Sequence, residues 1–152
     1  MDNTEKTHIN LVLEAEQRYN THEVRVSLET AKMLQKVGFD WECECAILPA
    51  SLMADKAYHY NHNGSHNYNN KEKYPFEIYS APSLDVAQRW LREVKGLIVQ
   101  IDFLRHNKWW YLVLQGERVE TLENPRVKFD TYEEAQEAGI QKCLTILLNE
   151  GK

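Results

Sequence analysis

The chain has 152 residues, of which 43% are hydrophobic and 27% are charged, the balance of an ordinary globular protein. This length predicts a single domain over residues 1–152, and the composition excludes a chain that stays disordered. The net charge of −5 opposes general binding to phosphate backbones. Residues 89–128, with eight basic and five acidic side chains, form the one block with a basic balance.

The cysteines and the lack of long apolar runs favour a cytoplasmic protein. No basic start followed by an apolar stretch is visible, and no apolar run is long enough to span a bilayer. Cys43, Cys45 and Cys143 are an odd number of thiols in a chain that needs no disulfide for stability. Cys43 and Cys45 also lack the spacing of a redox pair or a zinc knuckle. We therefore expect reduced thiols, no cofactor and no membrane contact.

The first third of the chain predicts helices and short strands. Apolar residues at helical spacing favour a helix over 9–19, and the alternation over 24–26 indicates a short strand. Ser27 is the predicted N-cap of a helix that ends before Gly38, a residue able to adopt a positive φ. The alternation of charged and apolar residues over 42–48 then predicts a half-buried strand.

A polar segment over 55–74 separates these elements from the second half. It is rich in asparagine and tyrosine and poor in aliphatic residues, so we expect little contribution to the core and a mobile loop or hairpin. Asn63-Gly64 is typical of a two-residue hairpin turn because both residues tolerate positive φ. Residues 76–79 predict a further short strand.

The second half contains the clearest helix and hairpin signals. Ser83 is the predicted N-cap of a helix that ends at Gly96, with an apolar stripe that Trp90 widens and that includes Val94. We expect Trp90 to be buried between helix and sheet. Residues 97–104 and 109–115, joined by a polar turn, predict an antiparallel hairpin.

A last strand and a last helix complete the predicted fold. Val127 and Phe129 favour an edge strand, and Thr131 with Glu134 forms a capping box before a long helix. Helices segregated from antiparallel strands indicate an α+β fold with three helices packed on one face of an antiparallel β-sheet.

A resemblance covers mainly the second half of the chain. The residues that carry it are Pro82-Ser83, Ala87, Trp90 to Glu93, Trp109, Phe129 to Ala135 and Cys143-Leu144, together with Lys36 to Asp40 in the first half. In these positions the chain resembles a family of small uncharacterised proteins of gut Bacteroidetes, their phages and integrated elements. The resemblance implies an accessory protein of a phage or mobile element, and it implies no activity, ligand or catalytic residue.

A metal site would have to use the histidines of the polar segment. His59, His62 and His66 share one face of a helix but not of a hairpin turning at Asn63-Gly64, where His62 lies on the opposite face. A zinc site needs convergent ligands, so a solvated polar loop is the favoured interpretation and zinc binding the alternative.

The predicted hairpin offers the best candidate for a binding surface. The candidate partner-binding residues are Arg92, Arg105, Lys108, Trp109, Trp110 and Tyr111. Consecutive strand residues point to opposite faces, so either Trp109 and Tyr111 or Trp110 alone lies outside. Aromatic and arginine side chains are frequent in protein interfaces, and the same residues are able to stack on single-stranded nucleic acid.

No nucleophile elbow, phosphate-binding glycine loop, zinc-protease motif or dinucleotide fingerprint occurs in the sequence. An enzyme whose catalytic groups meet only in space remains an alternative. The leading expectation is a non-enzymatic module that binds an unknown protein, with single-stranded nucleic acid as the second candidate.

Overall fold

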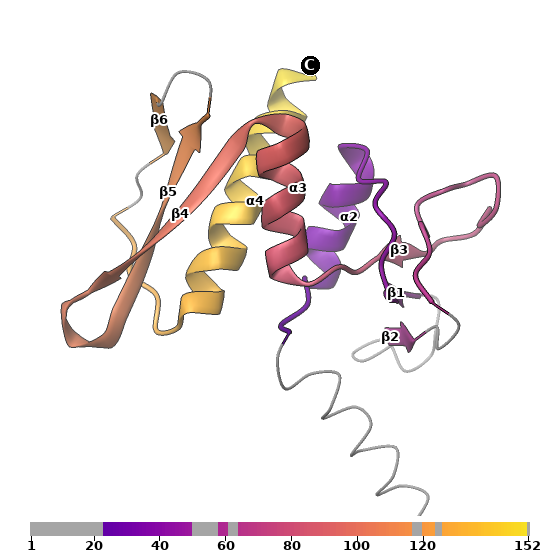
Figure 1. The fold of residues 1–152 in the computed structure, drawn as a ribbon, viewed down its shortest axis with the longest axis horizontal. Coiled ribbons are helices and arrows are strands. Elements are labelled where there is room, and N and C mark those ends of the chain that lie inside the picture. The colour runs from indigo at the N-terminus through magenta and orange to yellow at the C-terminus, as the bar shows by residue number, and fades with distance from the viewer. Residues whose placement is uncertain (1–22, 50–57, 61–63, 117–119, 124–125, 152) are drawn as a thin grey trace, which may run out of the picture.

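A layer of helices separates two small antiparallel sheets in the computed structural model (Figure 1). The structure describes residues 23–49, 58–60, 64–116, 120–123 and 126–151. The fold is α+β, as the sequence predicts. The predicted helix over 9–19 and His62 lie outside the described residues.

The first sheet has the strand order β2-β1-β3, with β1 at Cys45–Ile47, β2 at Tyr58–Tyr60 and β3 at Tyr79–Ser80. Both neighbours pair with β1 in antiparallel register. His66 forms a further antiparallel bridge to Cys43, so both β2 and His66 pair with the 43–47 segment. Of the two alternatives for the polar segment, a loop or a hairpin, the described residues do not form the hairpin turning at Asn63-Gly64, because Tyr58–Tyr60 and His66 pair with the 43–47 segment rather than with each other.

The second sheet has the order β4-β5-β6 and confirms the predicted hairpin. Strands β4 (Leu97–Leu104) and β5 (Lys108–Gln115) pair over eight residues each, from Leu97 opposite Gln115 to Leu104 opposite Lys108. Strand β6 (Glu120–Glu123) pairs with the end of β5 across a bulge, which the sequence did not predict. Phe129 bridges Trp109 beside the start of β5, at the position of the predicted edge strand.

Side-chain caps fix the start of each described helix. Helix α2 (Leu28–Lys36) begins after Ser27, α3 (Leu84–Lys95) after Ser83 and α4 (Tyr132–Glu150) after Thr131. In each case the hydroxyl of the cap accepts a hydrogen bond from the backbone N–H three residues on. Glu134, the partner in the predicted capping box, accepts from the N–H of Asp130, one residue before the cap.

The three helices do not all share one sheet face, which refines the predicted arrangement. Helices α3 and α4 pack against the β4-β5 hairpin, whereas α2 packs against α4 and β3 (Figure 1). The helical layer therefore packs against both sheets. The sequence predicted a single sheet, because contacts between distant segments decide which short strands pair, and no local pattern shows them.

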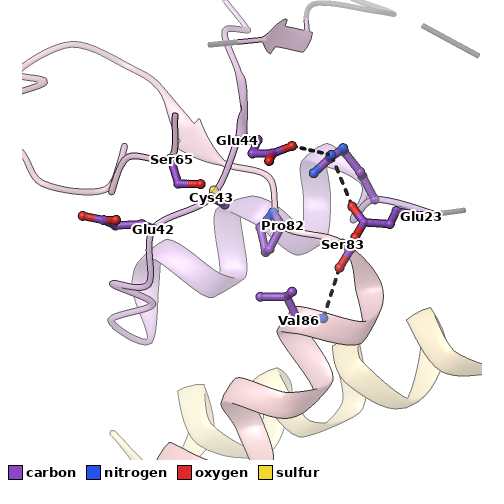
Figure 2. Close-up of a pocket in the computed structure, with 9 residues that line it drawn as sticks. Glu23, Glu42, Cys43, Glu44, Ser65, Pro82, Ser83 and Val86 are labelled. Atoms are coloured by element: carbon purple, nitrogen blue, oxygen red, sulfur yellow. Dashed lines mark hydrogen bonds and ion pairs between the residues drawn. The ribbon is translucent and has the colours of Figure 1, made fainter. Parts of the chain in front are cut away.

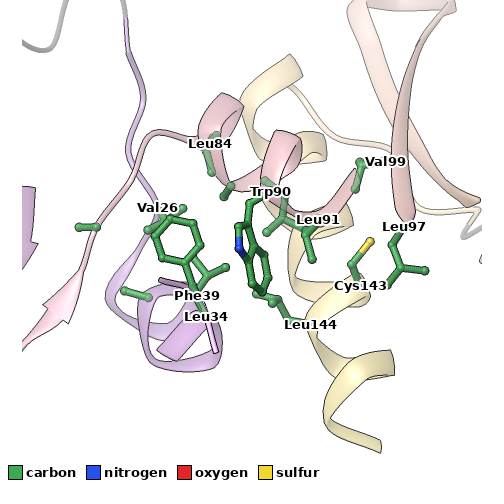
Figure 3. Packing of buried hydrophobic residues seen from close by; sticks show 14 of the residues in the cluster. Val26, Leu34, Phe39, Leu84, Trp90, Leu91, Leu97, Val99, Cys143 and Leu144 are labelled. Atoms are coloured by element: carbon green, nitrogen blue, oxygen red, sulfur yellow. The ribbon is translucent and has the colours of Figure 1, made fainter. Parts of the chain in front are cut away.

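The main core runs through this helical layer. Trp90 is 1% exposed, and its ring packs edge-on against Phe39 with centroids 5.3 Å apart. Figure 3 shows the indole among Leu34, Phe39 and Leu144, so Trp90 is buried as predicted but faces α2 and α4 rather than the hairpin. Val94, predicted to belong to the same stripe, is 50% exposed instead, because it follows the last buried turn of α3.

The end of the polar segment contributes more to the fold than its composition suggests. Tyr68 is buried in a second, smaller apolar cluster with Cys43, Ala46 and Ile78. The amide of Asn69 donates to the carbonyl of Phe39 at 2.9 Å. Its side-chain oxygen accepts from the backbone N–H of Ser80 at 3.1 Å and from Gln35 at 2.8 Å. Residues 64–74 thus include core and cross-linking contacts, which aliphatic content alone does not reveal.

A buried chain of amides connects α4, α3 and the edge strand β4. The Gln136 side chain is 2% exposed and donates to Asp85 at 2.7 Å and to Gln88 at 2.8 Å. Gln88 in turn donates to the backbone carbonyl of Val99 at 2.7 Å. These bonds satisfy polar groups that would otherwise be costly to bury.

Candidate functional site

The outward face of the β4-β5 hairpin is the leading candidate site. Alternation puts eight residues on this outer sheet face, away from α3 and α4: Ile98, Gln100, Asp102, Leu104, Lys108, Trp110, Leu112 and Leu114. Five of the eight are apolar and half-buried. No described helix covers this side of the sheet (Figure 1).

The hairpin separates the three consecutive aromatic residues. Tyr111 is 7% exposed and faces α4, where it lies next to Gly139. The centroid of its ring is 6.1 Å from that of Phe129. Trp109 points to the same side near the hairpin end, edge-on to Phe103 at 4.9 Å and to Tyr132 at 5.3 Å. Trp110 is therefore the ring of the outer sheet face. Its Nε1–H is enclosed and has no acceptor among the described residues.

The candidate basic residues do not form one patch. Arg105 is exposed at the hairpin turn, and Lys108 lies beside it in an ion pair with Asp130. Arg92 is exposed in the last turn of α3, close to the other end of β4. An eight-residue strand spans roughly 25 Å, which separates Arg92 from the other two. Arg92 instead lines a hollow of about 540 Å³ with Lys95, Ile98 and Gln115.

A smaller hollow of about 200 Å³ lies beside Arg25 and Cys43 (Figure 2). The Arg25 side chain is 6% exposed and its guanidinium is 3.5 Å from Glu23 and 3.9 Å from Glu44. It also donates to the carbonyl of Ala81 at 3.5 Å. Three glutamates, Glu23, Glu42 and Glu44, line the hollow with this one arginine, so it has no net positive charge to attract an anion.

The cysteines lack the environment of a nucleophile. All three are buried and free. Burial raises the pKa of the Cys143 thiol to about 12 and that of Cys45 to about 11. Burial likewise raises the pKa of Cys43. All three are therefore protonated at neutral pH, whereas a reactive cysteine needs a thiolate.

The structure does not assemble the histidine cluster within the residues it describes. His66 forms an isolated bridge to Cys43 beside the first sheet, and its enclosed Nε2 has no partner among the described residues. In β2, the backbone of His59 pairs with that of Ala46 in β1. In the described part of the chain no three histidine, cysteine or carboxylate side chains come together as a set of metal ligands.

A wide groove at the start of α4 was not predicted from the sequence. Its volume is about 520 Å³. It is lined by Val24, Ser27, Leu84, Phe129, Glu133, Glu134, Glu137, Ala138 and Gln141. We name it the acidic groove. The glutamates are visible in the sequence, but the apolar side chains between them come from distant segments that only the tertiary fold brings together.

Comparison with known proteins finds no match: no family model, curated protein or solved structure is similar to this chain. Among the described residues, no helix has the length and apolar character needed to cross a membrane.

Proposed function

We propose that the chain is a non-enzymatic binding protein whose outer sheet face contacts another protein. The observation that carries the proposal is Trp110, which shares with Leu112, Leu114 and Ile98 a sheet face that no described helix covers. Its role in a phage or mobile element rests only on the resemblance described above, which covers mainly the second half of the chain.

The chemistry of this face favours a protein over a nucleic acid. Large aromatic side chains with aliphatic neighbours are typical of the centre of protein interfaces, where they supply most of the binding energy. Stacking on bases needs exposed rings beside a continuous basic track. Only one of the three rings points outward, and Asp102 lies directly opposite it on β4.

Replacing Trp110 tests the proposal. We expect Trp110→Ser to keep the far-ultraviolet circular dichroism of the wild type and to weaken capture of a partner from the native host by at least roughly tenfold, through faster dissociation. Phe76→Ser is the matched control, because Phe76 is 53% exposed and lies outside the outer sheet face. Quantitative mass spectrometry of material retained by the three proteins measures the difference.

Nucleic acid is tested separately with labelled single-stranded DNA and RNA. We would assign a nucleic acid in place of the protein partner if anisotropy shows binding with submicromolar affinity. That affinity would have to fall steeply with salt and be lost in Arg105→Gln and Lys108→Gln. Equal retention of the same partner by Trp110→Ser and wild type would also contradict the proposed face.

A further inference from the structure

We infer that the acidic groove is a second docking site, which takes a basic peptide segment of a partner protein. The groove lies at the N-terminal end of α4, near the starts of α2 and α3, and its residues are separate from those of the outer sheet face (Figure 1). The inference is therefore independent of the proposed role of Trp110.

The floor of the groove is apolar. Val24, Leu84, Phe129 and Ala138 contribute it from four different segments. Leu84 is buried in the core, whereas Val24 leaves 50% of its surface exposed. A volume of about 520 Å³ is large enough for several side chains of a peptide, since ligand sites commonly span 300–1,000 Å³.

Hydrogen bonds hold two of the three glutamates at the rim. Glu137 Oε1 accepts from the backbone N–H of Ser27 at 3.0 Å and from the Thr30 hydroxyl at 2.7 Å. Glu134 Oε2 accepts from the Asp130 N–H at 3.2 Å. Their positions are thus set before a ligand arrives, which lowers the entropy cost of binding. Glu133 is exposed, and its side chain has no hydrogen-bond or ion-pair partner among the described residues.

The sign of the charge at the groove is negative. Three of its lining residues are glutamates, and no lysine, arginine or histidine is among its lining residues in the described part of the chain. Each helix start contributes only about half a positive charge. Even three such starts leave an excess of negative charge, and Glu29 and Asp85 in the first turns of α2 and α3 add to it.

Lysine and arginine side chains fit both properties of the groove. Each has an aliphatic stem that packs on apolar surface and a cationic end that stays at the polar edge. A peptide segment that carries such residues beside one apolar side chain would cover the floor and neutralise the rim. A purely apolar segment would match only the floor, and an acidic segment would be repelled by the rim.

The test uses two fluorescein-labelled decapeptides, one alternating Lys with Leu and one alternating Glu with Leu. We expect the full chain to bind the basic peptide and not the acidic one, with affinity that falls as salt rises. Glu133→Lys should weaken binding roughly tenfold, because rim charges govern association and its salt dependence. Val24→Ser should weaken binding by removing apolar contact from the floor.

Glu72→Lys is the matched control, since Glu72 is exposed in the 64–74 segment and the variant has the same net charge as Glu133→Lys. It should change affinity by less than about twofold if binding is local to the groove. Equal losses in the two variants, or equal binding of the two peptides, would overturn the inference. If the wild type sediments as a dimer and Glu133→Lys sediments as a monomer, the groove would instead be occupied by a second copy of this chain. Trp110→Ser should leave peptide binding intact, so a failure of the function proposed for the outer sheet face is distinguishable from a failure of the groove inference.

Discussion

Gly139 marks the closest approach of α4 to the β4-β5 hairpin. A Cβ atom at this position would lie 2.5 Å from Cγ1 of Val99 and 3.2 Å from Cγ of Tyr111. Val99 is stiff and 4% exposed, and Tyr111 is buried, so neither side chain has free space in which to move. The absence of a side chain at Gly139 therefore allows the helix to lie directly on the sheet.

We expect Gly139→Ala to destabilise the protein by about 2 kcal/mol in urea unfolding, because the 2.5 Å contact with Val99 puts the overpacking cost near the upper end of its range. Alanine gains roughly 1 kcal/mol of helix propensity, but overpacking a tight core contact costs about 1–3 kcal/mol. Gly151→Ala is the control at the end of the same helix, where the nearest atoms to a Cβ are 3.7 Å and 3.8 Å away. It should change stability by less than about 0.5 kcal/mol. A Gly139→Ala protein as stable as wild type would contradict this packing.

Local residue chemistry was the most predictable part of the sequence. The caps Ser27 and Ser83, the positive φ of Gly38 and the helix end at Gly96 were all identified from residue type and neighbours. Trp110 was predictable only as one of two alternatives, because alternation assigns a pair of faces but not which face the helices cover. The floor of the acidic groove was not predictable at all, since Val24, Leu84 and Phe129 are far apart in sequence.

The β4-β5 hairpin depends on an unusual turn. His106 and Asn107 both have positive φ, at 62° and 57°, within the single 3-10 turn Arg105–Asn107. Left-handed backbone costs most residues about 1–2 kcal/mol, less for asparagine and histidine, and nothing for glycine. This turn sets the register of all eight pairs between the two strands.

Substitution at Asn107 should show how strongly the turn governs the hairpin. Asn107 is exposed, so its replacement removes little packing. We expect Asn107→Val to lower the free energy of unfolding by about 1–2 kcal/mol, whereas Asn107→Gly should keep it within about 0.5 kcal/mol of wild type. Chemical denaturation monitored by tryptophan fluorescence measures both. Equal stability of the valine and glycine variants would mean that the turn relaxes without cost.

Strand pairing was less predictable than strand position. The 97–115 hairpin was predictable because a short polar turn joins two alternating segments. Strand β6 is polar, with the sequence Glu120-Thr121-Leu122-Glu123, and has no alternation that distinguishes it from a loop. Strand β1 pairs with β2 and β3 through contacts between distant segments, which no local pattern encodes.

At the scale of the whole molecule, one apolar cluster joins the two sheets. It includes Cys45 and Ile47 from the first sheet, Val99 and Val113 from the second, and the buried faces of all three described helices. Neither sheet has such a cluster of its own large enough to replace it, since the second cluster contains four buried residues. The two sheets are therefore expected to lose their structure together.

Two buried cysteines allow this cooperativity to be measured, because one lies in the first sheet and the other in the helical layer. Cys45 belongs to β1 and Cys143 to α4, and burial raises the pKa of both thiols above 9.0. At pH 8 we expect both to resist iodoacetamide in the native protein and to become reactive at the same urea concentration. Mass spectrometry of the alkylated peptides follows each thiol separately. Modification of Cys45 at clearly lower urea would show that the first sheet opens as its own unit.

The amide chain from Gln136 through Gln88 has a consequence for aggregation. Strand β4 is an edge strand of eight residues, and exposed edges of this length recruit strands from other molecules. Gln88 occupies the carbonyl of Val99 on this edge, and α3 packs beside it. An incoming strand would have to displace that amide, and a buried glutamine on α4 would then lose one of its two acceptors. The same bonds that organise the interior thus oppose growth of the sheet into an intermolecular β-structure.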